Sequence, residues 1–152
     1  MSRQKSGGMR HSKWLMIGAL VAAVLMGVGR LGSGLIDQAG SGSVPEPDCA
    51  AAISWDQAAQ HEGDEETIRG PVVGAVHAEG TSGQPTFLNL GRDHPDPDRF
   101  TVVIWNDVRA QFDQPPEMLF ENREICVAGE IQMHEGSPQI ELDGPGAIQF
   151  AD

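Results

Sequence analysis

The sequence predicts an all-β domain, a five-stranded barrel with a short N-terminal helix, preceded by a single membrane-anchor helix. Three features of the 152 residues support this prediction. One uncharged apolar run lies near the N-terminus, a Gly/Ser-rich segment follows it, and the remaining residues alternate apolar and polar side chains between Gly- and Pro-containing turns. Alternation with a period of two is typical of half-buried strands.

The N-terminal third is predicted to export and anchor the chain. Residues 1–13 form a basic tail, and residues 14–31 contain the apolar run WLMIGALVAAVLMGVG, the pattern of an export signal. The run is short for a spanning helix, but apolar residues continue beyond Arg30, whose long side chain can reach the membrane interface. We expect an uncleaved signal anchor, with a cleaved signal as the alternative. Because basic residues precede the run, the tail stays cytoplasmic, and a single pass through the inner, cytoplasmic membrane leaves the C-terminal domain periplasmic or extracellular.

Residues 32–48 are rich in Gly, Ser and Pro and predict a flexible linker to a domain of residues 49–152. This domain opens with a short helix within residues 49–60, for which Ser54 is the expected N-cap. The first strand is predicted at residues 67–77, where glycines allow sharp bending. One of its faces carries Ile68, Gly70, Val72, Gly74 and Val76.

The remaining strands are predicted from the same alternation. Residues 86–90 and 100–105 form a hairpin across a Pro-rich loop, and one helical turn is expected after Pro116. A fourth strand covers residues 124–133, and the last covers 139–143, with an extension to Phe150 as an alternative. Five strands, with glycines in the first and fourth and a helical connection between the third and fourth, match the oligonucleotide- and oligosaccharide-binding (OB) barrel.

Several short motifs in residues 49–150 carry a family resemblance. They are Ile53-Ser54-Trp55 with Ala58 and His61, Gly70-Pro71-Val72-Val73, Phe87-Leu88-Asn89-Leu90-Gly91, Phe100-Thr101-Val102-Val103-Ile104-Trp105, Ile125-Cys126-Val127 with Gly129 and Ile131, and Gly136 with Pro138-Gln139-Ile140. With these motifs the chain resembles small exported bacterial OB-fold proteins described as nucleic-acid-binding-like. The motifs are mostly structural, so the resemblance implies a fold. Arg69 stands where relatives are expected to carry a cysteine, and the resemblance therefore implies no disulfide pairing.

The two cysteines allow a pairing to be predicted from the residues themselves. Cys49 and Cys126 both lie in the exported part, and an even number of cysteines in an oxidising compartment favours a disulfide. The alternative is that Cys126, between Ile125 and Val127 in a strand, is a packed free thiol.

Charge excludes one class of partner. From residue 31 onward the chain has five arginines, no lysine and 22 acidic residues, a net charge of −17. Such a surface repels the phosphate backbone, so duplex DNA is not an expected partner. A high-salt habitat would account for the acidity without any partner.

No constellation in the sequence predicts catalysis. The histidines lack the helical spacing of zinc hydrolases, and the phosphate-loop, nucleophile-elbow and Cys-x-x-Cys motifs are absent. Asp93, Asp96 and Asp98 offer oxygen ligands to a cation but are interpreted as a solvated acidic turn. The arginines occur in separate segments, and this argues against the activity of a nuclease of the staphylococcal type. We therefore expect no enzyme activity, no cofactor and no metal.

The function predicted from the sequence is that of a membrane-tethered binding module. OB barrels bind ligands over their second and third strands. The candidate binding residues there are Asn89, Arg92, Arg99, Trp105 and Arg109, with Phe87 and Phe100 as further aromatics. The alternative for each aromatic side chain is that it fills the barrel core. Candidate ligands are single-stranded nucleic acid or an oligosaccharide, and the alternative function is an envelope protein-interaction or structural module.

Overall fold

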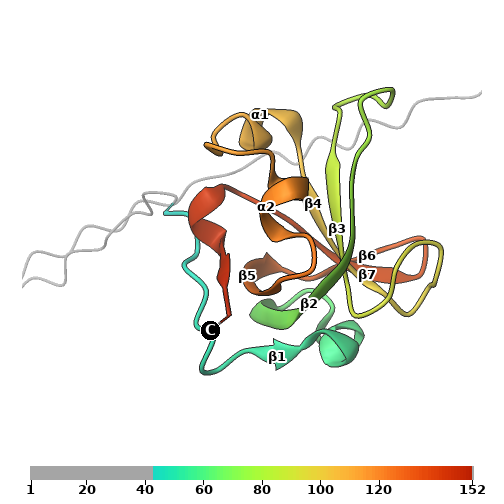
Figure 1. Cartoon of the computed structure of the whole chain (residues 1–152). Helices are drawn as coiled ribbons and strands as arrows, with labels where there is room; N and C mark the ends of the chain where they lie inside the picture. The colour runs from blue at the N-terminus through green and yellow to red at the C-terminus, as the bar shows by residue number, and fades with distance from the viewer. Residues whose placement is uncertain (1–42, 152) are drawn as a thin grey trace, which may run out of the picture. The chain divides into compact units, whose positions relative to one another are not determined.

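The computed structural model describes residues 43–151 (Figure 1). The predicted tail (1–13), the anchor (14–31) and the first part of the predicted linker (32–42) lie outside the described residues. Between residues 43 and 151, no helix has the length and apolar character needed to cross a membrane.

Five strands of the domain form a barrel. They are β2 (Glu65–His77), β3 (Thr86–Leu90), β4 (Phe100–Ile104), β5 (Glu124–Glu130) and β7 (Ser137–Glu141). In order of pairing the strands are β6 (Gln132–His134), β7, β4, β3, β2, β5 and β8 (Ile148–Phe150); β4 and β7 are parallel, and the other neighbours are antiparallel. A first strand shared by two antiparallel neighbours, together with parallel third and fifth strands, is the OB topology, and the predicted barrel is therefore confirmed.

Shorter elements complete the domain. They are β1 (Ile53–Ser54), the 3-10 helix η1 (Trp55–His61), α1 (Asn106–Arg109), α2 (Pro116–Phe120), β6 (Gln132–His134), the 3-10 helix η2 (Pro145–Ala147) and β8 (Ile148–Phe150). Both α1 and α2 lie in the connection between β4 and β5, where the sequence predicted one turn. The predicted N-terminal helix is present as η1, with Ser54 at its N-cap position but without a side-chain capping bond.

Two predicted strands are each divided in the structure. The strand predicted at residues 124–133 breaks at Ile131, whose N–H donates to the Asp64 carbonyl instead of continuing a strand. The suggested continuation of the last strand to Phe150 is wrong. β7 ends at Glu141, and the following Leu142 N–H still donates to the Val103 carbonyl of β4. Pro145 then begins η2, after which the chain returns as β8 to pair with β5.

The long strand β2 bends so that it belongs to both halves of the barrel. Its first half, Glu65–Pro71, pairs with β5, and its second half pairs with β3. The register shifts between Val72 and Gly74. Because one extra residue reverses the alternation of side chains, Val72 is buried in the core, whereas Val76, predicted on the same face, is 53% exposed.

The core lies inside the barrel and contains aliphatic side chains from every barrel strand. Its largest fully buried members include Ile68, Leu88, Leu90, Phe100, Val102, Ile104, Ile125, Val127 and Ile140. The barrel closes where β5 meets β7. The two strands are so close at this point that a Cβ on Gly129 would lie 2.7 Å from Ile140 Cγ2. Only glycine permits so close an approach at this position.

Trp55, the first residue of η1, packs against two glycines of the barrel wall. A Cβ on Gly70 would lie 2.6 Å from Trp55 Cδ1, and a Cβ on Gly91 would overlap the indole ring. Gly91 also has a φ of +71°, which L-residues rarely adopt. The motifs Ile53-Ser54-Trp55, Gly70-Pro71 and Phe87 to Gly91 therefore meet at one packing contact.

We predict that Gly91→Ala destabilises the domain by about 2–5 kcal/mol, the sum of a left-handed backbone cost and of overpacking against Trp55. The control is Gly80→Ala, where a Cβ would meet no atom within 4 Å. We expect the control to change the free energy of unfolding by less than about 0.5 kcal/mol in urea titrations. Equal stability of the two variants would contradict this packing.

The N-terminal edge of the domain is held by a disulfide and by polar contacts. Cys49 is bonded to Cys126 of β5, with Cα atoms 5.7 Å apart, which confirms the predicted pairing over the free-thiol alternative. Pro47 is buried, and its carbonyl accepts a hydrogen bond of 3.0 Å from Gln149 Nε2. Pro47, in the predicted linker, therefore packs against the C-terminal end of the domain.

We predict that Cys49→Ser lowers the free energy of unfolding by about 4 kcal/mol, because the bridge closes a loop with a sequence separation of 77 residues. Cys49 is chosen because Cys126 is fully buried and its replacement would also disturb the core. Urea unfolding of oxidised wild type and variant measures the difference. A variant within 1 kcal/mol of the wild type would show that the bridge does not restrict the unfolded chain.

Candidate functional site

A groove lies on the outer face of β3 and β4 and has a volume of about 360 Å³. We call it the strand groove. Its floor is formed by residues of β2, β3, β4 and β7, and its rim by the loop after β3 and the β6–β7 turn. Its lining includes Val76, Phe87, Asn89, Arg99, Thr101 and Gln139.

The strand register arranges the floor of the groove as two adjacent strips. In the polar strip, Asn89 pairs with Thr101, and Thr101 pairs with Gln139. In the apolar strip, Val76 pairs with Phe87. Residues directly paired across strands share a face, so hydrogen-bonding groups and apolar groups lie side by side.

Asn89 is fixed by two hydrogen bonds and is only 4% exposed. Its Nδ2 donates to Asp93 Oδ1 at 2.9 Å, and its Oδ1 accepts from Thr101 Oγ1 at 3.1 Å. The Asp93 carboxylate lies over Gly74, where any side chain would displace it. Asn89 therefore positions the loop after β3 relative to the sheet.

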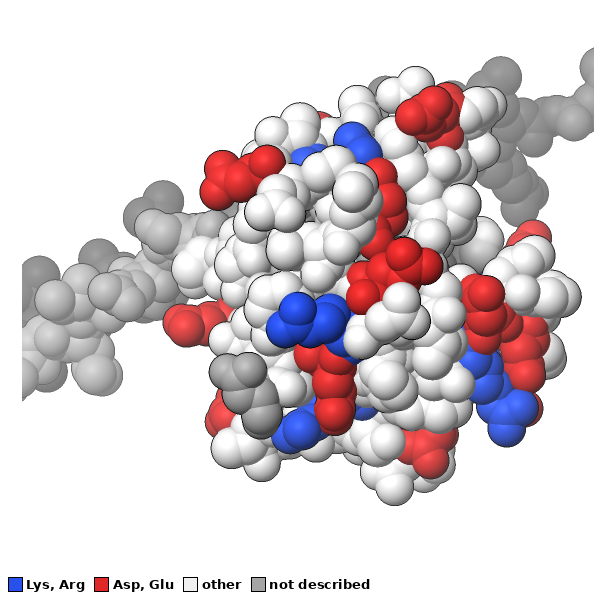
Figure 2. Space-filling model, viewed as in Figure 1, with Lys and Arg blue, Asp and Glu red and all other residues white. Residues whose placement is uncertain are grey.

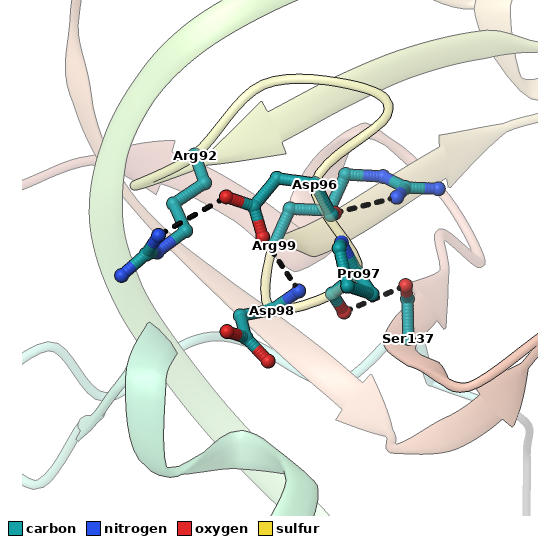
Figure 3. A network of polar contacts seen from close by, with 6 residues as sticks. All are labelled: Arg92, Asp96, Pro97, Asp98, Arg99 and Ser137. Carbon is teal, nitrogen blue, oxygen red and sulfur yellow. Dashed lines mark hydrogen bonds and ion pairs between the residues drawn. The ribbon is translucent and has the colours of Figure 1, made fainter.

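This loop is held against β7 by a network centred on Asp96 (Figure 3). Asp96 Oδ2 accepts from Arg92 Nη1 at 3.0 Å, and its Oδ1 accepts from the Asp98 N–H at 2.9 Å. Ser137 Oγ of β7 donates to the Pro97 carbonyl at 2.8 Å. In Figure 1 the loop accordingly lies beside the β6–β7 hairpin, which gives the groove a defined rim.

Arg99 contributes a cation to the groove. Its Nη1 donates to the Asp96 carbonyl at 2.7 Å, and the guanidinium extends away from Arg92 (Figure 3). Among the described residues, no carboxylate lies within 4 Å of Arg99, and its Nε and Nη2 have no hydrogen-bond partner. Nε and Nη2 form the edge of a guanidinium that binds a carboxylate through two parallel bonds.

The structure brings together only part of the predicted site. Asn89 and Arg99 line the strand groove, whereas Arg92, Trp105 and Arg109 do not. Arg92 is paired with Asp96. Trp105 donates from Nε1 to Glu141 Oε2 at 3.0 Å and is 36% exposed, so it does not fill the core.

Arg109 belongs to a polar contact between α1 and α2. Its Nη2 lies 2.7 Å from Glu117 Oε1, and both side chains are about four-fifths buried. Burial is the largest single effect on Glu117 and opposes its ionisation, but the hydrogen bond and charge of Arg109, together with a backbone hydrogen bond, outweigh it and lower the pKa of this carboxyl below its ordinary value of 4.5. Arg109 therefore holds the β4–β5 connection together and is not available to a ligand in the groove.

The sequence analysis missed several residues that line the groove: His94, Thr101, His134, Ser137 and Gln139. The polar residues that occupy outward positions of otherwise apolar strands, Asn89, Thr101 and Gln139, were a usable signal. Of the two aromatics proposed beside them, Phe87 lines the groove, and Phe100 is fully buried in the core.

One group of metal-ligating side chains lies away from the groove, at the end of η1. The ligand atoms of His61, Asp64 and Glu66 are within 4.8 Å of one another, a combination that the sequence analysis did not single out. Zinc accepts such nitrogen and oxygen ligands. His61 Nδ1 already lies 3.5 Å from Asp64 Oδ2, and Asp64 is exposed, so we interpret the group as a solvated polar cluster.

The surface around these sites is acidic. On the face shown in Figure 2, acidic residues are scattered widely, and the few arginine patches mostly border red. Three of the five arginines in the described region are paired with carboxylates, and Arg123 stacks on the Phe150 ring at 4.5 Å. Arg99 and Arg123 are therefore the two described arginines that no carboxylate pairs with, and Arg99 is the one of the two that lines the strand groove.

No protein-family model and no curated protein matches the chain. Among solved structures, the chain is similar to the hypothetical protein ygiW from E. coli (14% identity, TM-score 0.41), covering 72% of this chain and 99% of that one. It is also similar to the second OB-fold domain of replication protein A from Methanococcus maripaludis (18%, TM-score 0.40), covering 66% and 96%.

A third similar structure is asparaginyl-tRNA synthetase from Pyrococcus horikoshii, with 14% identity and a TM-score of 0.43. The match covers 66% of this chain but only 23% of the synthetase chain. Of these three structures, the replication protein A domain is the one described as an OB-fold domain, and the fold of this chain is assigned from its own strand order.

We predict that the pKa of Asp96 lies below its ordinary value of 3.8, because the Asp98 N–H and the Arg92 guanidinium both stabilise the carboxylate. A lowered pKa contributes stability above pH 3.8, and this contribution is lost as the pH falls through the folded-state value. NMR titration of the Asp96 carboxyl measures it. Arg92→Ala should raise the pKa only part of the way to 3.8, because the Asp98 N–H remains. A value at or above 3.8 in the wild type would contradict the network.

Proposed function

We propose that the protein is a membrane-tethered, extracytoplasmic OB-fold binding module whose ligand, single-stranded nucleic acid or an oligosaccharide, occupies the strand groove. The observation that carries the proposal is the position of this groove. It lies on the face of β3 and β4, the second and third barrel strands, and is bordered by the β6–β7 turn. OB folds bind ligands on this face and between the equivalent loops.

The proposed location rests on the N-terminal sequence and on the disulfide. A basic tail followed by an apolar run supports export and anchoring by residues 14–31, with residues 32–42 as a tether. The Cys49–Cys126 bond supports an oxidising compartment, where such bridges persist. We therefore propose that the barrel lies on the extracytoplasmic side of the inner membrane.

Binding without catalysis is the activity that the groove chemistry favours. Ser137 is the serine that lines the groove, and its hydroxyl donates to the Pro97 carbonyl rather than to a histidine. A nucleophilic serine needs a base within hydrogen-bond reach. The groove instead offers an ordered set of amide, hydroxyl and guanidinium groups beside an apolar strip.

The two ligand classes differ in what the groove can supply. Stacking contributes about 1–3 kcal/mol per base, and Phe87 is the aromatic residue that lines the groove. A complex with millimolar affinity already needs about 4 kcal/mol. One stacked base would fall short of that unless several phosphates were also neutralised, and Arg99 is the arginine in position to do so. The polar and apolar strips suit a sugar chain better.

The proposal is tested by NMR titration of the isotope-labelled full-length protein in detergent micelles with three probes. They are an eight-nucleotide oligothymidylate, maltotetraose and a tetrasaccharide that carries one uronate. We predict that at least one probe shifts the amide signals of Phe87, Thr101 and Gln139. Phe87→Ala should then weaken binding by about tenfold or more, because the apolar strip loses its largest surface.

The matched control is Val73→Ala, an exposed apolar residue of β2 that does not line the groove. It should change the affinity by less than twofold. Perturbations confined to other faces, or no binding by any of the three probes, would contradict the proposed function.

A further inference from the structure

The strand groove offers a ligand three kinds of contact. It has a strip of hydrogen-bonding side chains, a strip of apolar side chains, and one guanidinium whose bidentate edge has no partner among the described residues. A pyranose ring presents hydroxyl groups at its edge and C–H groups on its face. It therefore matches the first two strips at once, and the third contact calls for an anion.

The polar strip contains one side chain that is fixed and one that is available. The side-chain amide of Asn89 is hydrogen-bonded to Asp93 and Thr101. Gln139, at the other end of the strip, has no side-chain hydrogen bond within residues 43–151 and is half-buried. An amide has two donors and an acceptor, so Gln139 can bind a pair of neighbouring hydroxyl groups.

The charges around the groove indicate a ligand with few anionic groups in contact. Arg99 is its permanent cation, and Glu135 and Asp93 lie on the same rim. Phosphates repeated at every unit would meet these carboxylates and the acidic surface beyond them. A single carboxylate seated against Arg99 would avoid this repulsion, and its planar shape fits the Nε and Nη2 edge.

From these observations we infer that the strand groove binds an acidic oligosaccharide of the uronic-acid type, with one carboxylate paired to Arg99 and its sugar ring over Phe87 and Gln139. The inference rests on the proposed function, because it names the ligand class of the same groove. Arg92 prepares the site indirectly: it holds Asp96, whose carbonyl accepts from Arg99 Nη1 and so leaves the opposite edge of the guanidinium open.

The test compares a tetrasaccharide that carries one uronate, and hence one carboxylate, with its methyl ester, which lacks that negative charge, by calorimetry with the full-length protein at pH 7. The wild type should bind the acid at least tenfold more tightly than the ester. Rising salt should weaken binding of the acid and leave the ester unaffected, because only the acid forms an ion pair.

Variants separate the contact with Arg99 from the charge of the whole domain. Arg99→Ala should lower affinity for the acid by about tenfold or more and leave affinity for the ester within twofold. Arg99→Lys keeps the charge but loses the bidentate edge, so we expect an intermediate loss. The control Arg69→Ala removes the same charge from an exposed ion pair with Glu124 outside the groove and should change neither affinity by more than twofold.

The outcomes distinguish this inference from the proposed function. If the ester binds in the groove as tightly as the acid, or if oligothymidylate binds more tightly than both, the inference is wrong and the groove remains a binding site. If Arg99→Ala and Arg69→Ala weaken binding of the acid equally, the effect is one of overall charge and the inference is also wrong. If none of these probes binds, the inference and the proposed function fail together.

Discussion

The pairing of one strand, β2, with two different neighbours is the constraint on which the rest of the domain depends. Its first half is bonded to β5 and its second half to β3, so a single continuous backbone joins both sides of the barrel. The irregularity between Val72 and Gly74 lets the strand turn from one side to the other. It also moves Val76 to the outside, where this residue becomes part of the apolar strip of the groove.

Small residues along this strand then determine what can lie against it. Gly70 accepts the Trp55 ring on one side of the barrel, and Gly74 accepts the Asp93 carboxylate on the other. Asp93 orients Asn89, and Asp96 holds the following loop against β7 through Pro97 and Ser137. The shape of the groove is thus a consequence of backbone pairing and of a few short polar contacts that stiffen one loop.

Sequence patterns were sufficient for the barrel but not for the site. Strands such as 86–90 could be located because Leu88 and Leu90 alternate with Phe87 and Asn89, and period-two alternation depends only on local sequence. The reversal at Val72 could not be foreseen, because it arises from pairing with β3. β8 was missed as a separate strand for a related reason, since its partner β5 is distant in sequence.

The candidate binding residues show the same limit more clearly. Asn89 and Arg99 were identified because they flank the second and third strands, whereas Gln139 was not, because it joins them only through the parallel pairing of β4 with β7. The pairing of Arg109 with Glu117 depends on how two helical turns pack, and no periodicity reveals it. Counting cations in the sequence therefore overstated the charge available to a ligand.

The central claim is that the outer face of β3 and β4 holds the ligand, oriented by Arg99. The most direct measurement is a crystal structure of the protein with a bound tetrasaccharide that carries one uronate. We predict a carboxylate within hydrogen-bond distance of Arg99 Nε and Nη2, with the adjoining sugar ring over Phe87 and its hydroxyl groups on Gln139. A ligand bound on another face of the barrel, or one in the groove with its carboxylate turned away from Arg99, would contradict this claim.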